Sequence, residues 1–264
     1  MAVRASAPAA ESPLPVLADP DLSPFPPGVV PRAVMIQRWS RVGFVHHPYE
    51  PGLIQRLLPP GLEVDTFDGA GWLGMLPFHL EVRLPAWAPA LPWASSTLET
   101  NLRTYVRGPD GRRGIFFLYL DASRLLAVLT ARTWYGIPYR WAHLRFERRG
   151  RVIRYQSLRR EPLGAQLDLC LCVGERVTPS ELTQLERFLI CRWRLYSETG
   201  DGIAVTEVEH EPWPVRRAEI LGIDERLTEA VGLSPGSTPS LAHYAQGVTA
   251  RFARRRAART TQPS

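Results

Sequence analysis

The nine residues from Leu98 to Val106 constrain the fold of this chain more than any other segment. They include β-branched and aromatic residues but neither Gly nor Pro, so we predict a β-strand. Side chains alternate between the two faces of a strand. The residues expected on one face are Glu99, Asn101, Arg103 and Tyr105. An acid, an amide, a guanidinium and a phenol would therefore lie within reach of one another.

Two interpretations of this polar face are open at the level of sequence. In the first, it is a row that faces water, or a Glu–Arg pair that stabilises the sheet. In the second, it is the polar side of a pocket inside a curved sheet. A water-facing row more often repeats Lys, Glu, Thr or Ser, and this segment does not.

The rest of the chain contains many further short strand-like segments. We predict strands over 34–46, 62–67, 72–84, 115–120, 139–147, 152–158, 166–173, 203–209 and 241–248. Asp68-Gly69, Asp110-Gly111 and Arg149-Gly150 are expected turns. Short helices are expected after Pro51, after a cap at Ser123, and after the capping box Thr178-Pro179-Ser180-Glu181. This pattern predicts an α+β, β-rich fold, a curved or closed sheet with a few peripheral helices.

Three regions are expected along the chain. Residues 1–33 are rich in Pro and are predicted to be a disordered leader. Residues 34–246 are predicted to form a single domain, and residues 247–264 an Arg-rich flexible tail. The tail carries a net charge of +5, the leader −1 and the central region +2. The nearly neutral central region disfavours a dedicated nucleic-acid surface.

The chain contains no Lys, so all 32 basic residues are Arg. No side-chain amine is available for a Schiff base, which excludes that form of covalent catalysis. The three cysteines give no disulfide framework. No signal peptide or membrane span is visible, so we expect a cytoplasmic protein.

Common chemical motifs are weak or absent. Gly69-Ala70-Gly71-Trp72-Leu73-Gly74 matches the dinucleotide-binding pattern, but a turn leads it into a strand containing Pro77, so we interpret it as a false positive. His46 and His47 would point to opposite faces of a strand, and Cys170-x-Cys172 has no second ligand pair. We therefore expect no metal and no cofactor. Recognisable serine or cysteine nucleophile motifs are also absent.

Several motifs together resemble the YqjF-like family of uncharacterised bacterial proteins, over about residues 35–220. These motifs are Leu58-Pro59-Pro60-Gly61-Leu62, Asp68-Gly69-x-Gly71-Trp72, Pro77-Phe78, Glu99-x-Asn101-x-Arg103-Thr104-Tyr105-Val106, Gly114-Ile115-Phe116-Phe117-x-x-Leu120-Asp121, Ala131-Arg132, Pro138-Tyr139 and His210-x-Pro212-Trp213-Pro214. That family is in turn similar to the acetoacetate decarboxylase superfamily. The resemblance implies a cone-shaped antiparallel β-barrel with an internal pocket.

The same resemblance implies that this chain lacks the Schiff-base chemistry known for the decarboxylase. Tyr139 stands where that enzyme has its Schiff-base Lys, Arg140 at the neighbouring Lys, and Thr133 in place of a Glu. Arg132 agrees with the family pattern. Glu99 matches a pocket glutamate of the decarboxylase. A tyrosine cannot form an iminium, although it can donate a hydrogen bond or a proton.

We therefore expect a pocket for a small anionic, carboxylate-type molecule, with lyase- or isomerase-like acid–base chemistry and no Schiff base. Whether the protein is an enzyme is left open. The expected catalytic residues are Glu99 and Tyr139, and the expected substrate-binding residues are His46, Asn101, Arg103, Tyr105, Arg132 and His210. Arg suits an anion because its planar fork binds two oxygens.

Other functions compete with this one. The chain could be a ligand-binding or protein-interaction scaffold that acts through the Trp-rich loop from Trp87 to Trp93 or through the tail. Nucleic-acid binding by the tail alone is a third option, and a homo-oligomer is compatible with all three.

Overall fold

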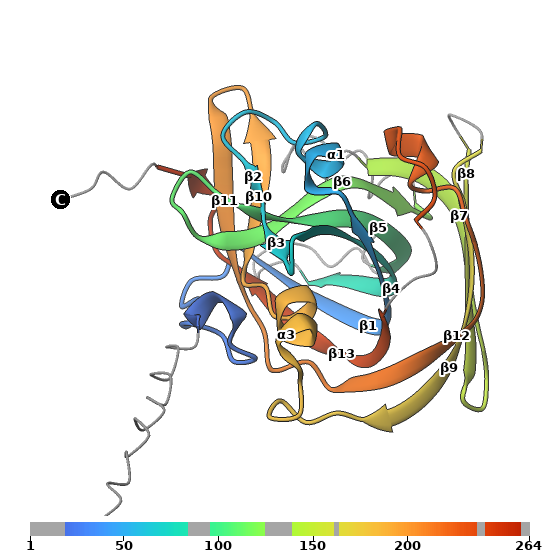
Figure 1. Cartoon of the computed structure of the whole chain (residues 1–264). Coiled ribbons are helices and arrows are strands. Elements are labelled where there is room, and N and C mark those ends of the chain that lie inside the picture. The colour runs from blue at the N-terminus through green and yellow to red at the C-terminus, as the bar shows by residue number, and fades with distance from the viewer. Residues whose placement is uncertain (1–18, 84–95, 125–138, 161–163, 237–240, 260–264) are drawn as a thin grey trace, which may run out of the picture.

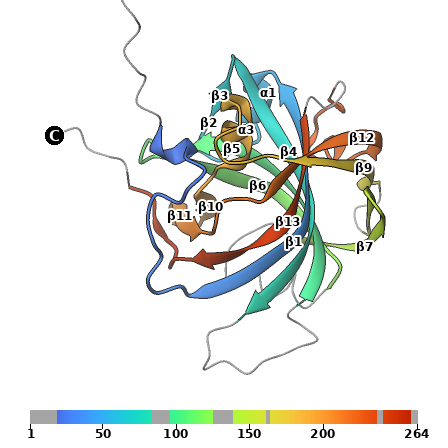
Figure 2. The ribbon, with the colours of Figure 1, turned by 90° about the horizontal axis from the view of Figure 1, so that it is seen from below.

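The computed structural model describes residues 19–83, 96–124, 139–160, 164–236 and 241–259 (Figures 1 and 2). Within these ranges the chain forms one 14-stranded sheet. Its strands are β1 (Met35–Tyr49), β2 (Glu63–Val64), β3 (Thr66–Phe67), β4 (Ala70–Arg83), β5 (Ser96–Arg107), β6 (Arg113–Ala122), β7 (Tyr139–Arg149), β8 (Val152–Arg159), β9 (Gln166–Arg176), β10 (Arg194–Thr199), β11 (Gly202–Glu209), β12 (Val215–Glu225), β13 (Leu241–Phe252) and β14 (Arg256–Ala257).

The described strands pair to form two closed rings, and Figure 1 shows the curvature of the sheet. The larger ring runs through β6, β7, β8, β9, β12, β13, β1, β4 and β5 and closes because β5 also pairs with β6. The smaller ring runs through β6, β10, β11, β13, β1, β4 and β5. Strands β13, β1, β4, β5 and β6 belong to both rings, and we call them the shared sheet. The β-rich architecture expected from the sequence is confirmed.

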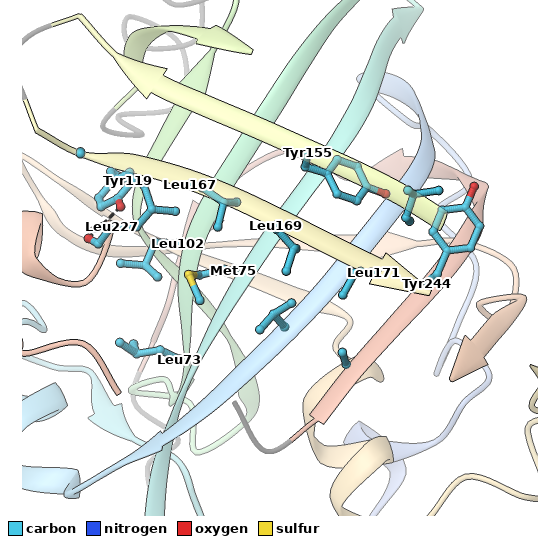
Figure 3. Close-up of a cluster of buried hydrophobic side chains, with 14 of the residues drawn as sticks. Leu73, Met75, Leu102, Tyr119, Tyr155, Leu167, Leu169, Leu171, Leu227 and Tyr244 are labelled. Atoms are coloured by element: carbon cyan, nitrogen blue, oxygen red, sulfur yellow. Dashed lines mark hydrogen bonds between the residues drawn. The ribbon is translucent and has the colours of Figure 1, made fainter. Parts of the chain in front are cut away.

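The larger ring encloses the main hydrophobic core, shown in Figure 3. Alternate residues of β9, such as Leu167, Leu169 and Leu171, face Met75 and Leu102 of the shared sheet. The alternation of buried and half-buried residues along β9 is the pattern of a strand with one face in a core.

The opposite face of the shared sheet is buried as well. Phe44 of β1 packs with Leu76 and Phe78 of β4, and Val208 of β11 packs with Phe252 of β13. The shared sheet therefore has no solvent face in its central part, which explains why β5 is buried without alternation from Glu99 to Val106.

The described α-helices are short. Helix α1 (Pro51–Gln55) begins at Pro51 as predicted, and Glu50 caps it. Helix α3 (Gln184–Ile190) begins later than predicted, because the capping box that forms is Thr183 with Glu186. The expected box at Thr178 and Glu181 forms an isolated turn instead. Two 3₁₀ turns, η1 (Pro20–Leu22) and η2 (Glu229–Val231), complete these elements. No helix in the described ranges is both long and apolar enough to cross a membrane.

Several expectations need correction. Strands β10 and β12 were not predicted, and β6 pairs in parallel with β7 and β10 where an antiparallel sheet was expected. Residues 247–252 belong to β13 and pair with β1, so they are not part of a flexible tail. The strand expected over 72–84 was predicted to be bent or interrupted at Pro77, but β4 continues through this residue opposite Thr100. The helix expected after Ser123 lies outside the described residues.

Residues 19–33 are also more structured than a disordered leader. Asp21 is buried and accepts hydrogen bonds from Arg112, Arg194 and the backbone of Arg113. Burial raises the pKa of Asp21, but these hydrogen bonds outweigh it and hold that pKa well below its usual value. The segment is therefore attached to β6 and β10 by a buried carboxylate.

A second buried carboxylate, Asp65, occupies the break between β2 and β3. It accepts hydrogen bonds from Arg192 at 2.9 Å and from Arg113 at 2.5 Å. Arg107 lies 3.4 Å away. The single strand expected over 62–67 is interrupted here because Asp65 faces these guanidiniums.

Replacing Asp65 by Asn should lower the free energy of unfolding by about 3–5 kcal/mol, because the Arg192 side chain, 1 % exposed, would lose its opposite charge. Urea denaturation followed by circular dichroism measures the loss. The exposed turn residue Asp201, replaced by Asn, is the control and should change stability by less than about 0.5 kcal/mol. Equal losses in the two variants would contradict a special role for Asp65.

Candidate functional site

A row of polar side chains lies on the face of the shared sheet that is turned toward the smaller ring. His46 of β1 pairs with Gly74 of β4, and Gly74 pairs with Arg103 of β5, so three neighbouring strands place these residues at one level. Asn101 and Glu99 follow along β5, opposite Leu76 and Phe78. His243 of β13 lies opposite Phe44. We call His46, Glu99, Asn101, Arg103 and His243 the interior cluster.

The β5 members of the interior cluster are shielded from solvent. Glu99 is 2 % exposed, Asn101 5 % and Arg103 7 %. A water-facing row is therefore excluded. A simple Glu–Arg pair is excluded too, because Arg103 Nη2 donates to the carbonyl oxygen of Leu189 at 3.0 Å and makes no ion pair within the described ranges.

Glu99 and Tyr139, the two expected catalytic residues, are in direct contact. The Tyr139 hydroxyl donates to Glu99 Oε2 at 3.2 Å. Burial raises the pKa of Glu99 to about 8, and the hydrogen bond from Tyr139 partly opposes this rise. Glu99 is thus largely protonated near neutral pH and can act as a hydrogen-bond or proton donor.

Two of the expected binding residues are neutral imidazoles. Burial, followed by the positive charge of Arg103, holds the pKa of His46 well below its ordinary value. Burial likewise lowers the pKa of His210 to about 4. His210 is packed between Trp193 and Trp213, with ring centroids 4.6 and 5.0 Å away. Its Nδ1 lies 2.6 Å from the carbonyl oxygen of Glu211. His210 is therefore held by an aromatic cage, whereas His46 belongs to the row.

Tyr105 has a role in packing. Its hydroxyl donates to the Leu189 carbonyl at 2.8 Å, and its ring packs against Phe188 of α3. This contact holds the end of α3 against β5, next to Arg103. Arg132 lies outside the described residues.

His243 and its partner Glu186 were not predicted from the sequence. The fully buried His243 has its Nε2 3.0 Å from Glu186 Oε1. This hydrogen bond is the main reason why the pKa of Glu186 falls to about 2. Glu186 also closes the capping box of α3 with Thr183. The capping-box spacing was visible in the sequence, but nothing in it shows that this Glu reaches a strand 57 residues later.

Gly74 makes space for the row. A Cβ at this position would lie 3.2 Å from both His46 Cδ2 and the Tyr105 hydroxyl, closer than ordinary contact. Gly69 has a φ of +76° in the turn between β3 and β4, and a Cβ at Gly71 would meet Ile54 at 2.9 Å. The dinucleotide-like glycine pattern therefore has local structural causes, and it lies in a turn and a strand as the sequence indicated.

Several buried polar atoms of the interior cluster have no hydrogen-bond partner among the described residues. They are His46 Nδ1 and Nε2, Glu99 Oε1, Asn101 Oδ1, Arg103 Nε and His243 Nδ1. Buried polar atoms are normally paired, so a concentration of unpaired ones is typical of a place where water or a ligand supplies the partners. In the described ranges, no group of three or more His, Cys, Asp or Glu side chains is arranged to hold a metal ion.

Comparison with solved structures shows which fold this is. A structure of the enduracididine biosynthesis enzyme MppR superposes with a TM-score of 0.62 at 13 % identity, covering 87 % of this chain and 91 % of that one. The acetoacetate decarboxylase of Legionella pneumophila superposes with a TM-score of 0.54 at 12 % identity, covering 94 % and 99 % of the two chains. An acetoacetate decarboxylase-like enzyme from Sphingomonas wittichii RW1 gives 0.54 at 16 % identity, over 86 % and 92 %. The fold is therefore acetoacetate decarboxylase-like.

Comparison of sequences shows the family. The uncharacterized protein YqjF of Bacillus subtilis is 34 % identical over 213 residues, which cover 81 % of this chain and 88 % of that protein. The model of the DUF2071 family, described as an uncharacterized conserved protein, matches residues 36–249, a span that includes the whole interior cluster. The chain thus belongs to the DUF2071 family, together with YqjF, and has the acetoacetate decarboxylase-like fold.

Proposed function

We propose that the protein binds a small carboxylate-bearing molecule at the interior cluster and carries out acid–base chemistry on it without a Schiff base. The observation that carries this proposal is the concentration of buried polar atoms without partners on β1, β5 and β13. A purely structural core would pair or replace such groups, because each unpaired buried polar atom costs about 1–3 kcal/mol.

Arg103 is the anion-binding residue of this proposal. Its Nη2 is fixed by the Leu189 carbonyl, while Nε has no partner among the described residues. A guanidinium has five N–H groups in a planar fork, so a substrate carboxylate can bind to the groups that remain. Asn101 is the next residue on the same face of β5, where its Oδ1 can accept a hydrogen bond from a hydroxyl group of the bound molecule.

Glu99 and His46 supply the acid and the base. A carboxyl group with a pKa near 8 is a proton donor at neutral pH, and Tyr139 orients it. The neutral His46 can accept a proton at the ring nitrogen that carries no hydrogen, and neither of its nitrogens is engaged by a described residue. Such a pair supports lyase- or isomerase-like proton transfer at a carbon next to a carbonyl group.

The absence of Lys leaves no side-chain amine for an iminium, so the substrate carbonyl would be polarised by hydrogen bonds from groups such as Glu99 and Tyr139. One of the MppR structures contains pyruvate. Another contains the condensation product of pyruvate and imidazole 4-carboxaldehyde. These structural relatives support 2-oxo acids as the first substrate class to test here. Binding without turnover is the alternative function.

Pyruvate and other small 2-oxo and carboxylic acids should raise the melting temperature of the protein. A ligand at one hundred times its dissociation constant stabilises the folded state by about 2.7 kcal/mol. We expect Arg103→Gln to abolish this shift, because it removes the charge that binds the carboxylate. A thermal-shift screen of the full chain measures the effect, and turnover assays follow on any acid that binds.

The matched control is Arg38→Gln, which removes an exposed Arg on β1 and should leave the shift unchanged. Circular dichroism verifies that both variants are folded. If no acid stabilises the wild type while Arg103→Gln alone melts much earlier, the row is structural and the proposal fails.

The stability of the protein should depend on the ionisation of Glu99. Its pKa is about 8 in the folded state and near 4.5 when unfolded, so the folded state binds the extra proton between these values. Stability from this group is complete below about pH 4.5 and is lost as the pH rises toward 8. The limiting slope is about −1.4 kcal/mol per pH unit. Urea denaturation at pH 6.5 to 8 measures it.

Glu99→Gln should flatten this dependence, since it removes the titrating group but keeps the shape. Tyr139→Phe should extend the loss of stability to higher pH, because the hydrogen bond from Tyr139 lowers the folded-state pKa of Glu99 and the unfolded-state pKa is unchanged. Measurements above pH 6.5 avoid the pH dependence of stability that arises from His46 and His210. Their pKa values are lowered on folding, so their effect on stability falls below this pH. A wild type and a Glu99→Gln variant with the same slope would contradict the buried, protonated Glu99.

A further inference from the structure

A cavity of about 490 Å³ lies at the end of the larger ring, away from the interior cluster. It forms where the β7–β8 hairpin, the end of β9 and the start of β12 meet β13. Its lining residues are Arg148, Arg151, Val173, Gly174, Glu175, Arg216, Tyr244 and Gln246. We call it the arginine cavity. Three of its eight lining residues are Arg, and Glu175 is its one acidic lining residue.

Each of the three guanidiniums is anchored by a single backbone carbonyl. Arg148 Nε donates to Gly150 at 3.0 Å, Arg151 Nε to Val173 at 2.9 Å, and Arg216 Nη1 to Gly174 at 2.7 Å. All three side chains are exposed, and none forms an ion pair with a described residue. The remaining N–H groups of each guanidinium are therefore held near the cavity and are available to bind a ligand.

Arg41 adds a fourth positive charge beside the cavity. The β1–β13 register passes from Ser40–Gly247 to Val42–Ala245, which leaves Arg41 beside the lining residue Gln246. Arg41 has a φ of +54°, a conformation that is costly for a residue with a side chain. Its carbonyl accepts a hydrogen bond from the Tyr155 hydroxyl at 2.8 Å, which helps to hold this backbone.

Three of these four charges act on the Tyr244 hydroxyl. Burial raises the pKa of Tyr244, and Arg148, Arg41 and Arg216 oppose this rise, which is expected only if their charges are close to the hydroxyl. Tyr244 O–H donates to Gln246 Oε1 at 3.3 Å, so a hydroxyl and an amide join the guanidiniums at the cavity. This combination provides both charge and hydrogen bonds for an anion.

We propose that the arginine cavity binds a small phosphorylated molecule through its phosphate groups. A planar guanidinium group can donate two parallel hydrogen bonds to two oxygens of one phosphate group. Several guanidinium groups at one site favour an anion with more than one negative charge. The volume lies in the range of small-molecule sites. The site is separate from the interior cluster, because Tyr244 and His243 are neighbours on β13 and so point to opposite faces of the shared sheet.

Inorganic pyrophosphate is the probe for this site, measured by isothermal titration calorimetry on the full chain. We expect the wild type to bind pyrophosphate. Each of the single variants Arg148→Gln, Arg151→Gln and Arg216→Gln should have a dissociation constant at least tenfold higher than the wild type. Arg149→Gln is the control, because Arg149 is exposed in the same hairpin but does not line the cavity. It should change the dissociation constant less than threefold.

The absence of pyrophosphate binding at millimolar concentration would overturn the proposal. So would equal weakening by Arg149→Gln and Arg148→Gln, which would indicate diffuse attraction to a positive surface. Vesicles containing phosphatidic acid form a second arm, and binding to them without binding to pyrophosphate would point to a membrane surface and overturn the proposal. Arg148→Gln should keep any response to 2-oxo acids, so this test is independent of the proposed function.

Discussion

The burial of the shared sheet on both faces is the constraint on which the rest of this structure depends. Sheets buried on both sides usually contain nearly continuous apolar runs, because no water is present to solvate polar groups. Here β5 places Leu102 in the main core and Glu99, Asn101 and Arg103 on the opposite face. The same exclusion of water that makes these residues costly keeps Glu99 protonated and His46 neutral. The chemistry of the interior cluster is thus a consequence of the two-ring architecture.

Much of the fold could be predicted because it is encoded locally. Period-two alternation identifies β9, β-branched and aromatic residues without Gly or Pro identify β5, and Asp68-Gly69 identifies the turn between β3 and β4. Strand β10 was missed because it begins with Arg194, a residue that a buried strand accommodates only when a counter-charge is present. That counter-charge is Asp21, 173 residues earlier in the chain. Strand β12 was missed because its outward residues, such as Arg216 and Arg217, obscure the alternation, and its pairing with β9 is irregular.

The candidate site, like the fold, could be predicted from the sequence only in part. Glu99, Asn101 and Arg103 share a face of one strand, so the sequence alone was enough to group them. Their burial, and the contact of Glu99 with Tyr139, depend on how β5, β6 and β7 pair. The partnership of Glu186 with His243 joins a helix to a distant strand, and no local pattern predicts it. Local periodicity therefore identifies which residues share a strand face, whereas ring closure decides which strands contribute to the site.

The attachment of the N-terminal segment has a consequence for how the domain should be delimited. The family match begins at residue 36, yet Asp21 is the buried partner of Arg194 and Arg112, and Ser23 accepts a hydrogen bond from Trp193. Glu209 of β11 accepts a further hydrogen bond from the backbone of Val30. A recombinant fragment cut at the family boundary would leave the buried Arg194 without its carboxylate and uncover Trp193, which packs against His210. The physical unit of folding is thus longer than the region that sequence similarity delimits.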